Sequence, residues 1–196
     1  MQTTPARTDL ILIGDSIRMG YEAAVRQQLV DRSIWSPEAN GGDSANVLRH
    51  LDEWVVRHAP AIVHLNCGLH DLKKPFDSDR AQVELDDYRR NLEQIFTRIL
   101  ATGATLVWAT TTPVDEVLHH QNKDFDRFAA DVDRYNAVSL ELAATKNVAV
   151  NDLHAVIDSA GAAHLRRDDG VHFTEPGSSL LGGAVADFVR PLLTHP

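Results

Sequence analysis

The chain alternates short apolar runs with longer segments whose apolar residues recur at helical spacing. The short runs have the length of strands and occupy residues 8–13, 33–36, 61–66, 105–110 and 147–150. The segments with helical spacing occupy residues 18–30, 44–58, 83–101 and 124–145, and a last one runs to Leu193. Repeated strand–helix units predict an α/β fold, with a mainly parallel sheet that carries helices on both faces.

The residues between these segments are consistent with one domain. Pro60 and Gly103 stand where the second and third helical segments end, and Ser44 is placed to cap the start of the second. The first turn lacks the Gly-x-Gly-x-x-Gly fingerprint of a dinucleotide-binding fold, and no phosphate-binding Gly-x-x-x-x-Gly-Lys-Ser/Thr segment occurs. We expect residues 1–196 to form a single three-layer α/β/α sandwich around a mainly parallel, flavodoxin-like five-stranded sheet.

The first apolar run ends abruptly on a serine. Residues 10–13 have the pattern of a strand buried on both faces, Gly14 permits a tight turn, and Ser16 follows where a helix begins. Ligand crevices of open α/β sheets form at this carboxyl edge, where helix amides can stabilise negative charge. A serine in this place is also a common helix N-cap, so the position alone does not identify a nucleophile.

A second polar segment lies near the other end of the chain. Asp169 and His172 stand three residues apart, just before the last apolar helical run. This spacing lets the carboxylate fold back on the imidazole, which fixes the tautomer and turns the other ring nitrogen toward a nucleophile. Asp168 is the alternative partner, and a polar loop with a solvated histidine is the alternative structure.

Residues 14–17, Gly-Asp-Ser-Ile, together with the Asp169-x-x-His172 segment, resemble the SGNH (GDSL-type) hydrolase family. The resemblance spans nearly the whole chain. It implies that Ser16 is a nucleophile, His172 its general base and Asp169 the residue that orients the base.

Two further segments carry the same resemblance. Residues 41–44, Gly-Gly-Asp-Ser, look like the family's second block, which implies that the Gly42 amide helps to form an oxyanion hole with the Ser16 amide. Residues 68–71 read Gly-Leu-His-Asp, so His70 occupies the place of the family's asparagine donor. Because an imidazole N–H can also donate, we expect His70 to complete the oxyanion hole. The alternative has His70 turned outward, with Asn66 or water in its place.

The order of these segments fits the predicted fold. Ser16, Gly42 and His70 follow the first three predicted strands, whereas His172 precedes the last helix. The connections after parallel strands share one edge of the sheet, so residues distant in the sequence can converge there.

The resemblance implies a serine hydrolase that cleaves carboxylic esters through an acyl-enzyme. The chain shows no insertion long enough for a lid, which favours short, acetyl-type acyl groups on a small alcohol or a carbohydrate. An acyltransferase that uses the same triad is one alternative, since an acyl-enzyme can also be attacked by an alcohol. A catalytically silent binding module is the other, because His70 replaces the asparagine.

Composition narrows the class of partner. A formal charge of -9 disfavours nucleic acid, and no apolar run approaches the roughly 20 residues that cross a bilayer. Residues 1–5 lack the basic-then-apolar pattern of a signal peptide, which favours the cytoplasm. The adjacent His119 and His120 lack a third spaced ligand, so we expect no metal there but a solvated loop, with a rim that contacts substrate as the alternative. We also expect no cofactor. The sequence does not indicate an oligomeric state.

Overall fold

The computed structural model describes residues 8–161 and 164–194 of the chain. Its central sheet has five parallel strands in the order β2-β1-β3-β5-β7. These strands are β1 (Leu10–Ile13), β2 (Ile34–Trp35), β3 (Ile62–Leu65), β5 (Thr105–Ala109) and β7 (Ala149–Asn151). Each strand overlaps one of the predicted apolar runs, so the prediction of an α/β fold with a five-stranded parallel sheet is confirmed.

The middle of the sheet is buried on both faces. All four residues of β1 lack exposed surface, and β1 pairs with β3 from Leu10 opposite Ile62 onward. Continuous aliphatic runs suit this place because helices cover both faces of a parallel sheet. The strand order is flavodoxin-like and reverses between β1 and β3, so the carboxyl ends of these two strands flank the ligand-binding crevice of such sheets.

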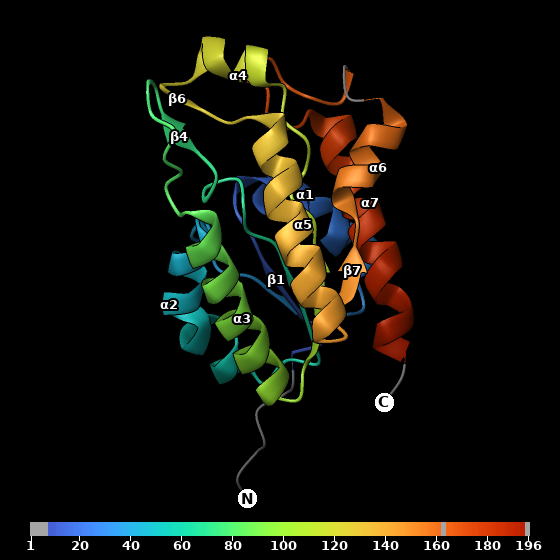
Figure 1. Ribbon diagram of the computed structural model, residues 1–196. Helices are drawn as coiled ribbons and strands as arrows, with labels where there is room; N and C mark the ends of the chain where they lie inside the picture. The colour runs from blue at the N-terminus through green and yellow to red at the C-terminus, as the bar shows by residue number, and fades with distance from the viewer. Residues whose placement is uncertain (1–7, 162–163, 195–196) are drawn as a thin grey trace, which may run out of the picture.

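Two layers of helices cover the sheet (Figure 1). One layer contains α1 (Ser16–Gln28), α6 (Leu153–Ala160) and α7 (Glu175–Val189). The other contains α2 (Ser44–Trp54), α3 (Leu85–Ala101) and α5 (Ala129–Thr145). Short 3-10 helices follow α2 and α7, at η1 (Val56–His58) and η3 (Arg190–Thr194). Within the described part of the chain, no helix combines the length and the apolar composition needed to cross a membrane.

The region above the sheet differs from the prediction of a solvated loop followed by a helix from residue 124. The chain forms α4 (Glu116–Asn122) and the strand β6 (Phe125–Asp126) there, and β6 pairs antiparallel with β4 (Lys74–Pro75). Figure 1 shows α4 at the top of the molecule, next to these two strands. The helix α6 was also not predicted from the sequence. Elements this short depend on tertiary contacts for their stability, and local periodicity does not reveal such contacts.

His119 shows why the loop prediction is wrong. Its side chain lies on α4 with no exposed surface, and its Nε2 accepts a hydrogen bond from Arg127 Nη1 at 2.9 Å. The ring also packs edge-on against Phe125. Of the two adjacent histidines, only His120 is exposed to solvent.

Aspartates cap the two helices that begin beside the crevice. Asp43 caps α2, and its carboxylate accepts a hydrogen bond from a backbone amide of the first turn at 2.8 Å. Asp15 caps α1 in the same way, at 2.9 Å. The prediction that Ser44 caps its helix is therefore wrong, because a preceding carboxylate interacts more favourably with the helix N-terminus. Ser44 and Ser16 are instead the first residues of α2 and α1, so the Ser16 hydroxyl is not used as a cap.

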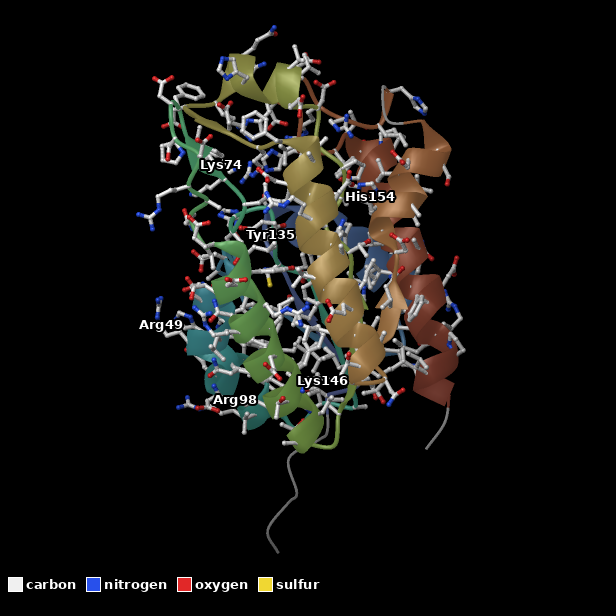
Figure 2. The ribbon with its side chains drawn as sticks, in the orientation of Figure 1. Arg49, Lys74, Arg98, Tyr135, Lys146 and His154 are labelled. Carbon is white, nitrogen blue, oxygen red and sulfur yellow. The ribbon has the colours of Figure 1, made fainter. Side chains whose placement is uncertain are left out.

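The carboxyl ends of the strands point to the upper end of the molecule. Figure 2 shows Lys74 of β4 at this upper end, with His154 at the start of α6. Arg98 and Lys146, near the ends of α3 and α5, lie at the lower end. Side chains at the lower end are therefore suitable controls for effects at the upper end.

Candidate active site

Three of the predicted residues, from opposite ends of the chain, meet at the carboxyl edge of the sheet. Ser16 Oγ lies 2.8 Å from His172 Nε2, and His172 Nδ1 lies 2.5 Å from Asp169 Oδ2. Because Nδ1 faces a carboxylate, it keeps the ring proton and donates a hydrogen bond to Asp169, which leaves Nε2 to accept a hydrogen bond from the Ser16 hydroxyl. Such an arrangement can take the proton from Ser16 while its oxygen attacks a carbonyl carbon.

The loop before α7 holds Asp169 as an anion. Its Oδ1 accepts hydrogen bonds from the backbone amides of Val171, at 3.1 Å, and His172, at 2.9 Å, while Oδ2 faces the imidazole. Partial burial on its own raises the pKa of Asp169, but the hydrogen bonds from His172 and Val171 outweigh burial and lower its pKa below the usual range. Asp168 is exposed, and its carbonyl accepts the Asn122 side chain. The structure therefore places Asp169, and not Asp168, against the ring.

The loop that contains Gly42 packs on the turn before Ser16. Gly41 N donates to Gly14 O at 3.0 Å, and a Cβ on Gly41 would lie 2.7 Å from that oxygen, so only glycine permits this approach. The Gly42 amide donates to Asn40 Oδ1 at 2.8 Å. Asn40 is exposed, so its carboxamide is free to turn away. An oxyanion at Gly42 would have to replace that carboxamide oxygen.

His70 follows β3 in a half-buried position, and its ring makes no hydrogen bond to any residue that the structure describes. Burial lowers the pKa of His70; the Asp15 carboxylate opposes this effect and the Arg127 guanidinium adds to it. The ring is therefore neutral at pH 7 and has one N–H to donate. The backbone amide of Ser44 donates hydrogen bonds to both carboxylate oxygens of the next residue, Asp71, at 2.9 and 3.1 Å. These bonds fix this segment to the start of α2.

Residues at the two ends of α4 hold the loop that contains Asp169. Asp115 N donates to Gly170 O at 2.8 Å, and a Cβ on Gly170 would lie 2.4 Å from Asp115 O, so residue 170 must be glycine for the segments to meet. Lys123 Nζ lies 3.4 Å from Asp169 Oδ2, the oxygen that faces His172. This role of Lys123 was not predicted, because no local sequence pattern indicates a contact between segments so far apart.

A second cation that was not predicted from the sequence, Arg127, lies against the segment that follows β3. Arg127 is buried, and its Nε donates to Leu69 O at 2.5 Å. Burial lowers the pKa of Arg127 to about 10, so the guanidinium remains charged at pH 7, and the Asp15 and Asp169 carboxylates favour that charge. Across residues 8–161 and 164–194, no cluster of three or more His, Cys, Asp or Glu side chains could hold a metal ion.

Comparison with known proteins relates this geometry to a family. The model of the GDSL-like lipase/acylhydrolase family matches residues 12–180. This span contains Ser16 and reaches through Asp169 and His172 into α7. No curated protein matches the chain.

Solved structures show the same fold at low sequence identity. A lipase/acylhydrolase from Enterococcus faecalis is 21% identical, with a TM-score of 0.78 over 94% of this chain and 96% of that one. An acetyl xylan esterase is 18% identical, with a TM-score of 0.74 over 92% of this chain and 99% of that one. A GDSL-like lipase from Bacteroides thetaiotaomicron is 15% identical, with a TM-score of 0.78 over 97% of this chain and 92% of that one.

Proposed function

Because the chain belongs to the GDSL-like lipase/acylhydrolase family, we propose that it is an esterase that cleaves carboxylic esters through an acyl-enzyme on Ser16. The observation that carries this proposal is the pair of contacts that links Ser16 to His172 and His172 to Asp169. A hydroxyl, an imidazole and a carboxylate in this order form the unit with which serine hydrolases transfer acyl groups.

The reaction has two steps. In the first, Ser16 Oγ forms a bond to the ester carbonyl carbon while the hydroxyl proton passes to His172 Nε2. The C–O bond to the alcohol then breaks, and the departing alcohol takes the proton from Nε2. In the second, water gives a proton to Nε2 and attacks the acyl carbon, and the proton returns to Ser16 as the acid leaves. Asp169 stabilises the imidazolium in both steps, and the amides of Ser16 and Gly42 with the His70 ring bind the oxyanion.

The substrate that we propose is a short-chain, acetyl-type ester of a small alcohol or a carbohydrate. The similarity of the fold to an acetyl xylan esterase is consistent with this class. Activity should be highest on the p-nitrophenyl acetate member of a series of esters with increasing acyl length.

A serine-reactive phosphonate should label Ser16 stoichiometrically, and labelling that is absent or unrelated to Ser16 would favour a silent fold. Product analysis with an added alcohol separates hydrolysis from acyl transfer.

Replacing His70 with alanine should reduce kcat by roughly 10- to 1,000-fold, with a smaller change in KM, because an oxyanion donor acts mainly in the transition state. The neutral ring, whose N–H has no partner among the described residues, supports this role. Steady-state kinetics on p-nitrophenyl acetate measures both constants. His70→Asn should recover part of the loss, since it restores an amide donor; unchanged turnover in His70→Ala would exclude direct donation.

A further inference from the structure

A cavity of about 510 Å³ opens beside Ser16, between α1 and the start of α7. Its wall on α1 runs from Ser16 to Gln27, which corresponds to about 16 Å of helix. Small residues of that helix, Gly20 and Ala23 among them, line this wall. These short side chains leave room beside the helix, and the cavity extends from Ser16 along it as far as Gln27.

The cavity lies on one particular side of the serine. Ser16 and His172 line it, whereas Gly42 and His70, the proposed oxyanion donors, do not. In the proposed reaction, His172 passes its proton to the oxygen of the leaving alcohol, so that oxygen must lie within hydrogen-bonding distance of Nε2. The alcohol therefore leaves toward the side that His172 occupies, which is the side of the cavity.

The polar groups of the cavity indicate what kind of alcohol fits. The hydroxyls of Ser178 and Ser179 on α7 make no hydrogen bond to any described residue. Arg167 uses Nε to bind Phe173 O at 3.0 Å, and its two terminal nitrogens have no partner among the described residues. Glu175 adds a carboxylate at the rim. A fatty chain would leave these donors and acceptors unsatisfied, whereas a group with many hydroxyls can pair with them.

We propose that this cavity binds the alcohol portion of the ester, and that this portion is a polyhydroxylated group of more than one sugar-sized ring. The inference rests on the proposed esterase function, because it takes the direction of the leaving group from that reaction. The volume lies within the range of clefts that enclose whole small molecules, and a methyl or ethyl group would leave most of it to water. Selectivity should accordingly depend more on the alcohol than on the acyl chain.

Blocking the cavity tests the proposal. Ala23→Trp fills it from α1, and Ser179→Trp fills it from α7 if the first variant fails to fold; both positions are exposed. Either change should lower kcat/KM for monoacetylated cellobiose by about 10-fold or more, the scale of a few lost pocket contacts. Hydrolysis of ethyl acetate should change by less than about 3-fold, because its small alcohol does not reach the blocked region. Ala137→Trp, at an exposed position of α5 in the opposite layer, is the matched control.

A binding measurement tests the cavity without relying on turnover. Cellobiose should bind saturably to the Ser16→Ala variant in an NMR titration, and adding Ala23→Trp should abolish that binding. Equal losses on both acetates, losses confined to esters of longer acyl chains, or cellobiose binding that Ala23→Trp leaves intact would overturn the proposal. If the wild-type protein cleaves neither acetate, the esterase function itself fails, and the titration still decides whether the cavity binds a carbohydrate.

Discussion

Ser16→Ala and His172→Ala should each lower esterase turnover by about 1,000- to 1,000,000-fold. The 2.8 Å contact between Ser16 Oγ and His172 Nε2 is the reason, because neither side chain can perform its part of the proton transfer without the other. The double variant should be only slightly worse than either single one, since residues that act as a unit give strongly non-additive losses. Single-turnover and steady-state assays on p-nitrophenyl acetate measure these changes.

Matched substitutions show whether these losses are specific. Ser159→Ala, at an exposed position, and His154→Ala, at the same upper end of the molecule (Figure 2), should keep normal turnover. Far-UV circular dichroism and thermal unfolding should show that all four single variants are folded. A folded Ser16→Ala or His172→Ala protein with near-normal turnover would remove the assignment of that residue.

Asp169→Asn should reduce kcat by about 100- to 10,000-fold, a smaller loss than that of Ser16→Ala. The carboxylate holds the proton on His172 Nδ1 through the 2.5 Å contact, and a carboxamide would favour the wrong tautomer. The same substitution also weakens the acceptor for the amides of Val171 and His172, so the loop itself should become less rigid.

Asp168→Asn is the control for this experiment, because it makes the same chemical change one residue away. Asp168 is exposed, and the hydrogen bond from Asn122 goes to its backbone carbonyl, which the substitution keeps, so turnover should stay within a few-fold of wild type. A larger loss from Asp168→Asn than from Asp169→Asn would reverse the choice between the two carboxylates.

The strands of the central sheet and the long helices could be predicted because their information is local. Continuous aliphatic residues in β1 and helical spacing in α3 and α5 each indicate one type of element without reference to the rest of the chain. The same logic failed for the short helices α4 and α6 and for β6, a two-residue strand outside the central sheet. Such short elements are stabilised by contacts with distant segments, so a local pattern is too weak to predict them.

The candidate site also has features that could be predicted from the local sequence and others that could not. The chemical types of Ser16, Asp169 and His172, with the three-residue spacing of the last two, predicted a triad, and the structure brings these side chains within hydrogen-bonding distance. Nothing in the local sequence showed that Lys123 lies beside Asp169. This contact depends on how loops that follow separate strands meet at one edge of the sheet.

The strands of the central sheet, the long helices, the family resemblance and the residue types available for chemistry could be predicted from the sequence, because they follow from periodicity and side-chain identity. Tertiary packing sets which carboxylate faces His172, which cation lies beside that carboxylate, and on which side of Ser16 a cavity opens. These properties depend on distances of a few ångströms between segments far apart in the chain. Packing sets such distances, and neither composition nor spacing specifies them.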